Sequence, residues 1–272
     1  MKKLLTLIIF LLIFNFFISL AKSIVVNTPY LNVSEIDPGE SFEVKANVTE
    51  GNVINITETN ITCYSSEGLE GENNWDSFTL LNYSLTWNVI DENTVEVSGV
   101  ITLNTSSISG DWSCKVYAKN SSYESTYNYT SFKVNKKVGI VVFEESCEFE
   151  EGLPGDENKS LDCGEKNYIT FMHDGNVNIT VKIKGSNLIG KDYPNWIIDV
   201  GNITYANVTY GSQAPSPSDI KLTQEEAVLI YSWDRGSYPY KNTNNLYCWL
   251  DYPSPLKVQT YEGTIYLIAV EV

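Results

Sequence analysis

Apolar and polar residues alternate in short runs along nearly the whole chain, and these runs are rich in Val, Ile, Thr and Tyr. In Phe42–Val48 and Val177–Ile183, for example, every second residue is apolar. Gly, Asn, Asp and Pro separate the runs, and only residues 223–231 have the composition of a short helix that could equally end in a strand. Period-two alternation in short runs bounded by turn residues predicts an all-β protein built from sandwiches or barrels.

The runs fall into two sets on either side of the polar joint Asn135-Lys136-Lys137. We expect the first set of strands near residues 41–48, 53–64, 78–90, 94–103, 112–119 and 126–134. We expect the second set near residues 138–143, 168–172, 177–184, 196–200, 203–210, 226–232, 246–251 and 263–271. The pattern therefore predicts two tandem β-sandwich domains, 24–135 and 136–272. A single continuous sandwich is the less common alternative for a chain of this length.

The amino terminus has the three parts of a secretory signal peptide. Lys2 and Lys3 precede an apolar run over residues 4–20, and the small-x-small sequence Ala21-Lys22-Ser23 follows it. This order predicts a signal peptide over residues 1–23, cleaved after Ser23, and an extracellular or cell-surface location. The apolar run is near the lower limit for spanning a bilayer, so an uncleaved anchor is the alternative.

The motif Asn-x-Ser/Thr, an acceptor of N-linked glycans in exported chains, occurs twelve times. Because the chain is rich in Asn, Ser and Thr, we expect some of these motifs to be ordinary strand and loop residues and not glycan acceptors. Strand alternation places Asn47 and Asn178 on the solvent face, where a glycan has room. The candidate glycosylation sites are Asn47, Asn82, Asn104, Asn128, Asn178, Asn202 and Asn207.

Charge and histidine content exclude several functions. The chain has 18 basic and 34 acidic residues and a formal net charge of −16, which argues against a nucleic-acid partner. His173 is its single histidine, so zinc sites and most histidine-based acid–base catalysis are disfavoured. There is no Gly-x-Ser-x-Gly motif. We therefore expect a protein that is not an enzyme, although 34 acids leave carboxylate pairs open as an alternative.

The first domain resembles immunoglobulin domains in two stretches. Residues 107–114 are similar to the corner that enters the sixth strand, where an aromatic residue lies two positions before the second cysteine. That residue is Trp112 here, so an indole N–H would replace the tyrosine hydroxyl. Ile61-Thr62-Cys63 resembles the second strand. The resemblance covers residues 24–135 and implies a disulfide between Cys63 and Cys114.

The same resemblance implies a buried tryptophan in the core. We expect Trp87, in an alternating run, to fill this position, and Trp75, in a polar stretch, to lie exposed in a long loop.

The second domain is similar in residues 174–180 and 248–255 to β-sandwich modules of archaeal cell-surface and S-layer-associated proteins. In such modules a proline turn leads into the closing strand. The residues alone support the same interpretation, because Pro253-Ser254-Pro255 and a later apolar run indicate a loop and a final strand.

Five cysteines in an exported chain leave at least one without an intramolecular partner. Cys147, Cys163 and Cys248 allow three single pairings. We favour Cys147–Cys163, which would close the acidic loop 148–162. Cys248 would then be a buried thiol, or alternatively a disulfide partner for another subunit.

Oxygen-bearing side chains alternate at Asp156, Asn158, Ser160 and Asp162, as in the first half of a calcium loop. An EF-hand would have a glycine at the place of Leu161 and a glutamate at the place of Asn167, so the motif is not an EF-hand. We expect no cofactor, with a looser calcium site as one possibility and a solvated acidic loop as the other.

Aromatic residues suggest where sugar rings could stack. Tyr238, Tyr240 and Trp249 form a weak candidate binding site in the second domain, and Tyr123, Tyr127 and Tyr129 share one strand region of the first. The alternative is that half-exposed tyrosines simply suit a pleated sheet.

The last run, Thr264–Val272, is apolar on both strand faces. If this run lies at a sheet edge, its unpaired backbone groups can pair with a strand from another chain, and Ile24–Val26 is a candidate for that strand. This predicts a possible homo-oligomer by strand addition, while packing under residues 211–245 is the alternative.

Together these features predict an exported, glycosylated, non-enzymatic structural or adhesion protein of the cell surface. Its expected partners are other envelope proteins or surface glycans. The alternative is a secreted carbohydrate-binding module or glycan-active enzyme that uses the aromatic-rich second domain.

Overall fold

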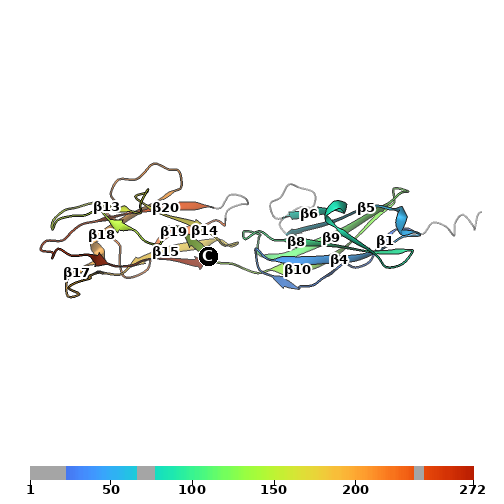
Figure 1. Cartoon of the computed structure of the whole chain (residues 1–272), viewed down its shortest axis with the longest axis horizontal. Coiled ribbons are helices and arrows are strands. Elements are labelled where there is room, and N and C mark those ends of the chain that lie inside the picture. Colours follow the sequence, from blue (N-terminus) through green and yellow to red (C-terminus); the bar gives the residue numbers. More distant parts are fainter. Residues whose placement is uncertain (1–22, 66–76, 236–241) are drawn as a thin grey trace, which may run out of the picture. The chain divides into compact units, whose positions relative to one another are not determined.

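The computed structural model describes residues 23–65, 77–235 and 242–272. Its regular structure is almost entirely strand, interrupted by the short 3-10 turns η1 (Val53–Asn55), η2 (Asn82–Ser84) and η3 (Val200–Asn202), so the predicted all-β class is confirmed (Figure 1). The chain divides into two compact units, Met1–Asn135 and Lys136–Val272. The division lies in the polar joint. Within the described residues, no helix has the length and apolar character needed to cross a bilayer.

The first domain consists of two sheets. One sheet has the order β1-β4-β8-β7, with β2 also beside β4, and the other has the order β3-β10-β9-β5-β6. All pairs are antiparallel except β3 and β10, which are parallel. This distribution of strands is that of an immunoglobulin-type sandwich. The strands are β1 (Val25–Val26), β2 (Tyr30–Leu31), β3 (Glu35–Ile36), β4 (Ser41–Thr49), β5 (Ile56–Ser65), β6 (Ser77–Leu81), β7 (Thr86–Val89), β8 (Thr94–Thr102), β9 (Gly110–Asn120) and β10 (Ser125–Val134).

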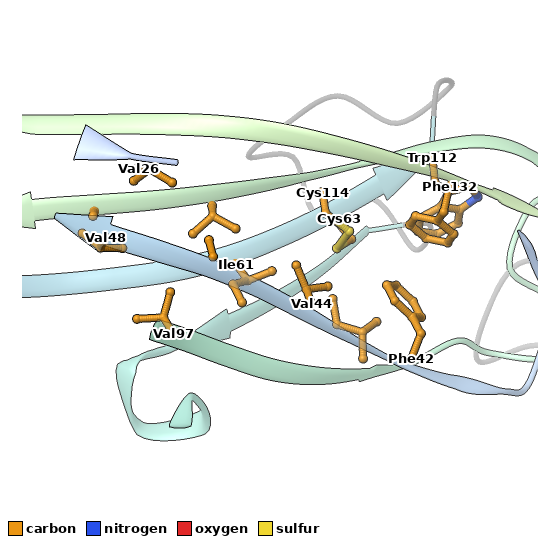
Figure 2. Packing of buried hydrophobic residues seen from close by; sticks show 14 of the residues in the cluster. Val26, Phe42, Val44, Val48, Ile61, Cys63, Val97, Trp112, Cys114 and Phe132 are labelled. Carbon is orange, nitrogen blue, oxygen red and sulfur yellow. A yellow bond between two sulfur atoms is a disulfide. The ribbon is translucent and has the colours of Figure 1, made fainter. Parts of the chain in front are cut away.

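Strand alternation builds the core of this sandwich. Along β4, Phe42, Val44, Ala46 and Val48 are buried, while the residues between them face outward. Figure 2 shows Phe42, Val44 and Val48 pointing toward the opposite sheet. There, the ring of Phe42 meets that of Phe132 at a centroid distance of 4.5 Å. Burial of such apolar side chains supplies the main stabilising free energy of the domain.

The disulfide of the first domain joins neighbouring strands, unlike the disulfide of immunoglobulin domains. Cys63 on β5 lies directly opposite Cys114 on β9, with a Cα–Cα distance of 4.0 Å. The immunoglobulin disulfide connects the two sheets. The assignment of Cys63 to the second strand was therefore wrong. Strand β4, which occupies the second-strand position in the opposite sheet, contains no cysteine. Cys63 lies in the next strand, β5, which is hydrogen-bonded to β9 in the same sheet.

The expected tryptophan assignment also changes. Trp112 is the largest fully buried side chain of this core, whereas Trp87 on β7 is only partly buried against it. Strand β7 is the edge of its sheet, so its residues have neighbours on one side only. Trp75 lies outside the described residues.

The second domain has a larger sheet and two small ones. The larger sheet has the order β11-β14-β20-β13-β12, with β18 also beside β20; the others are β19-β15-β22 and β17-β16-β21. The strands are β11 (Ile140–Val142), β12 (Glu148–Phe149), β13 (Lys159–Asp162), β14 (Ile169–His173), β15 (Ile179–Gly185), β16 (Leu188–Gly190), β17 (Ile197–Ile198), β18 (Ile203–Thr209), β19 (Ala227–Trp233), β20 (Thr243–Leu250), β21 (Tyr261–Glu262) and β22 (Ile265–Glu271). Residues 227–231, in the ambiguous segment, belong to strand β19 rather than to a helix.

Strand β20 is the centre of the second core. Residues 244–250 are all buried, because β20 has strands on both sides and side chains packed on both faces. Leu246, Cys248 and Leu250 face the same core as Val181 and Ile183 of β15.

Candidate functional site

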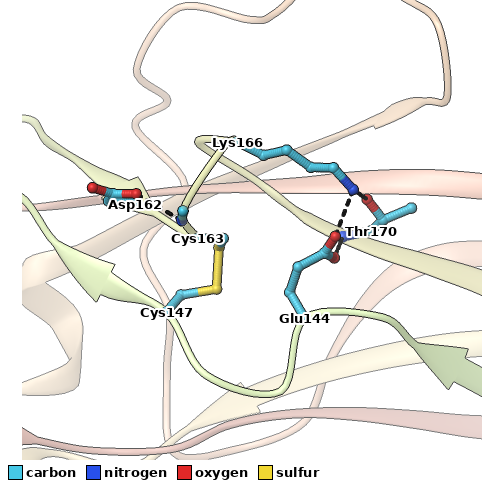
Figure 3. The surroundings of a disulfide bond; sticks show 7 residues. Glu144, Cys147, Asp162, Cys163, Lys166 and Thr170 are labelled. Atoms are coloured by element: carbon cyan, nitrogen blue, oxygen red, sulfur yellow. Dashed lines mark hydrogen bonds and ion pairs between the residues drawn. A yellow bond between two sulfur atoms is a disulfide. The ribbon is translucent and has the colours of Figure 1, made fainter.

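Each domain contains one disulfide. Cys147 and Cys163 are bonded with a Cα–Cα distance of 4.4 Å, so the favoured pairing is present alongside Cys63–Cys114. Beside the second disulfide, Lys166 Nζ lies 2.7 Å from Glu144 Oε1, and the backbone N–H of Thr170 donates to Glu144 Oε2 (Figure 3). Burial by itself would raise the pKa of Glu144, but the bonds from Lys166 and Thr170 outweigh it and hold the pKa below its usual value. The carboxylate thus ties residue 144 to strand β14.

Cys248 is a buried free thiol. Burial raises the pKa of this thiol to about 12, so it stays protonated and unreactive near neutral pH. A disulfide to another subunit would require the side chain to leave the core of the domain.

His173, the single histidine, is fully buried and has a structural role. The backbone N–H of Gly175 donates to Nδ1 at 3.1 Å, and Nε2 lies 3.0 Å from the carbonyl oxygen of Val177. These two contacts assign the proton to Nε2, which donates to that carbonyl. The ring also meets Trp233 edge-on at a centroid distance of 5.6 Å. Both nitrogens hold the β14–β15 turn, and neither faces solvent as a general base must.

Two of the proposed calcium ligands, Asp156 and Asp162, have other side-chain partners. Asp156 Oδ2 accepts from the backbone N–H of Leu153 and lies 3.1 Å from Lys159 Nζ, and these contacts lower the pKa of Asp156. Asp162 Oδ1 accepts from the backbone N–H of Gly164 at 2.8 Å. The backbone N–H of Asn158 donates to Asp251 Oδ1, and the backbone of Ser160 pairs with that of Trp249 in the sheet. Among the described residues, no group of three or more His, Cys, Asp or Glu side chains could hold a metal ion.

The aromatic site expected in the second domain is not presented to solvent where the structure describes it. Trp249 is 6% exposed, lies between β13 and β18, and stacks on Tyr247 at a centroid distance of 6.2 Å. The Trp249 side chain is therefore almost entirely enclosed within the domain. Tyr238 and Tyr240 lie outside the described residues.

An exposed tyrosine face lies instead on the first domain. We use this name for the outward side of β5, β9 and β10 around Tyr117, Tyr127 and Tyr129. Tyr127 and Tyr129 are 55% and 40% exposed, and their rings meet edge-on at 5.4 Å. Lys115 Nζ lies 4.5 Å from the ring centroid of Tyr127. Tyr123, at the turn between β9 and β10, is also exposed and lies under Lys119 Nζ.

Three of the sequon asparagines in the described part of the first domain donate hydrogen bonds within it through their side-chain Nδ2 atoms. Asn120 is 4% exposed; its Nδ2 donates to Glu50 and Glu124, and its Oδ1 accepts two backbone N–H groups. Asn82 accepts from Thr59 and donates to the carbonyl of Thr57. Asn128 points toward β1, where Nδ2 donates to the carbonyl of Val26. In Asn82 and Asn128, two of the predicted glycan acceptors, the reactive nitrogen is thus engaged.

The remaining predicted acceptors differ in exposure. Asn178 is exposed. Asn47 lies on the outward side of β4, as expected, but it is half-buried and its Oδ1 is enclosed without a hydrogen bond among the described residues. Asn104, Asn202 and Asn207 are half-buried, and Asn202 Nδ2 donates to the carbonyl of Asp199.

The strand expected to join neighbouring chains is already used. Val25 and Val26 form β1, which pairs with β4, and Ile24 and Val26 are buried in the first core. Residues 24–26 therefore cannot pair with another chain without uncovering that core. On β22, Ile265, Leu267 and Ala269 pack inward, while Tyr266 and Val270 on the other face are exposed.

Comparisons with known proteins show weak structural likeness. No family model matches the chain, and no curated protein matches it in sequence. A GspB Siglec domain is 13% identical with a TM-score of 0.28, covering 50% of this chain and 65% of its own. Dimeric latent PorU from Porphyromonas gingivalis is 12% identical with a TM-score of 0.32, covering 89% of this chain and 20% of its own. A DUF4785 family protein from Legionella pneumophila is 8% identical with a TM-score of 0.26, covering 90% of this chain and 47% of its own. These values define neither a shared family nor a shared function.

Proposed function

We propose that this protein is an exported, glycosylated structural or adhesion protein of the cell surface, without enzymatic activity. The observation that carries the proposal is the presence of a disulfide in each of the two domains. Such bonds form and persist in oxidising compartments outside the cytosol. The signal-like residues 1–23 and the dense sequons support the same location.

Two further observations support a binding role over a catalytic one. The single histidine is enclosed and engaged through both ring nitrogens, and the free thiol is buried. The first domain, by contrast, presents tyrosine and lysine side chains on an open sheet face. Aromatic residues with polar tips are the kind that recognition surfaces favour. We infer that its partners are other envelope proteins or surface glycans.

The location can be tested on whole cells of the source organism. A membrane-impermeant biotin reagent should label the protein on intact cells, and its amino terminus should begin at residue 24 if the signal is cleaved. A cytosolic protein of known location is the control for lysis. Recovery of the protein only from the cytosolic fraction, with all five cysteines reduced, would contradict the proposal.

Function at the surface can be tested by deletion. Cells that lack the gene should show weaker cell–cell aggregation or a more fragile envelope, and the intact gene should restore both. An unchanged envelope and unchanged aggregation, together with a measurable hydrolytic activity of the purified protein on envelope glycans, would favour a glycan-active enzyme instead.

A further inference from the structure

The tyrosine face contains a sequon on its strand β5. Asn60 lies on β5, directly opposite Tyr117 of β9, and Tyr117 lies opposite Tyr127 of β10. On the other side of Asn60, Leu81 of β6 is its cross-strand partner and is 40% exposed. Asn60 therefore lies in one continuous row with two tyrosines and a leucine, all on the outward side of the sheet. Side chains directly opposite each other in such a row are close enough to touch a common group.

The geometry of Asn60 suits an acceptor. Asn60 and Thr62 of the motif Asn-Ile-Thr are two residues apart on a strand, so both side chains point outward while Ile61 is buried between them. Among the described residues, the Asn60 side chain makes no hydrogen bond that would compete with a glycan. Asn82, Asn120 and Asn128 differ, because their Nδ2 atoms donate to other groups of the domain.

We propose that Asn60 carries an N-linked glycan and that the first sugars of this glycan pack on Tyr117 and Tyr127. The inference rests on the proposed export of the protein, because glycan transfer to this motif occurs only on exported chains. Sugar rings have an apolar C–H face, and packing it against an aromatic ring removes apolar surface of both from water. The glycan would thus cover the exposed aromatic surface and stabilise the sheet.

The dimensions of the sheet agree with this arrangement. Neighbouring strands are about 4.8 Å apart, so Tyr117 is one strand spacing and Tyr127 about two spacings from β5. A glycan of two or three sugars that lies across the strands spans this distance. The edge-on contact with Tyr129 and the Lys115 amine over the ring hold Tyr127 in place, so a packed sugar meets a pre-ordered ring.

Occupancy is tested first, by mass spectrometry of glycopeptides from the native protein of the source organism. We expect sugar on Asn60 and an unmodified Asn120, whose amide is buried and fully bonded. If Asn60 is bare while other sequons carry sugar, the present inference fails and the proposed export stands. If every sequon is bare and the protein is cytosolic, both fail.

Packing is tested by a double-mutant cycle on the thermal unfolding of the glycosylated protein. Tyr127→Ala should lower the midpoint of the first domain by about 4 °C more in the glycosylated protein than in the Asn60→Gln background, which corresponds to a coupling of roughly 1 kcal/mol. Tyr83→Ala, at a highly exposed tyrosine outside this row, is the matched control and should show no coupling to Asn60→Gln. An equal loss from Tyr127→Ala in both backgrounds would overturn the packing of the glycan on this face.

Discussion

The indole Nε1 of Trp112 donates a hydrogen bond of 2.9 Å to the backbone carbonyl of Ile108, four residues upstream. In immunoglobulin domains the tyrosine corner uses a hydroxyl for the same purpose. Trp112 combines this bond with the position of the largest buried side chain in the first core, where its ring lies 5.9 Å from those of Phe78 and Phe132. One residue therefore both fills the core and fixes the loop that leads into β9.

Replacement of this indole measures its two contributions together. Trp112→Phe keeps an aromatic ring but removes the N–H donor and part of the volume, so we expect a loss of about 2–3 kcal/mol in the free energy of unfolding. Denaturant unfolding monitored on the first domain measures this loss. Trp87→Phe, at a partly buried site, is the control and should cost less than 1.5 kcal/mol, roughly the value for a tolerated apolar exchange. Equal losses at the two positions would contradict the special role of Trp112.

The two disulfides should stabilise their domains in proportion to the loops that they close. With sequence separations of 51 and 16, the chain-entropy relation gives about 4 kcal/mol for Cys63–Cys114 and about 3 kcal/mol for Cys147–Cys163. The double variant Cys63→Ala/Cys114→Ala should lower the melting temperature of the first domain by more than about 10 °C. Calorimetry that resolves the two domains checks this, and Cys147→Ala/Cys163→Ala should leave the first transition in place. An unchanged first transition would show that the bond contributes nothing beyond the strand pairing.

Glu144 should make the second domain sensitive to acid. Its folded-state pKa is lowered, so its stabilising contribution is present above the unfolded-state pKa and is lost as the pH falls through the folded-state value. Glu144→Gln should therefore destabilise the domain at pH 7 and destabilise it less at pH 3. Unfolding curves at several pH values test this, with Glu145→Gln, at the exposed neighbour, as the control. A destabilisation of the same size at both pH values would contradict an ionic contribution.

His173 should matter for the stability of the second domain. His173→Phe keeps a ring against Trp233 but leaves the Gly175 N–H and the Val177 carbonyl without their side-chain partner, so we expect a loss of about 2–4 kcal/mol. Thermal unfolding of the second domain measures this loss. His173→Gln, which can still donate and accept, should recover part of it. A fully stable Phe variant would show that the turn does not depend on the imidazole.

Local pattern alone was sufficient for much of the architecture. Side chains on a strand point to opposite faces in turn, so alternation in Phe42–Val48 and Val177–Ile183 already identified strands and their buried sides. The polar joint at Asn135 and Lys136 likewise coincides with the division between the two units. Both features depend only on residues that are close together in the sequence, so the sequence alone was enough to predict them.

Only the tertiary structure shows which strands that are distant in the sequence pair with each other. Cys63 and Cys114 could be matched by resemblance, but only the strand order shows that they lie on neighbouring strands of one sheet and that β4 occupies the second-strand position in the other sheet. The same holds for Trp249, an aromatic residue in a strand that becomes buried because β13 and β18 both pair with β20. The row of Asn60, Tyr117 and Tyr127 arises in the same way, because residues 57 and 67 positions apart meet only through the register of three strands. Alternation tells which side of a strand a residue faces, whereas strand order and register decide what lies there.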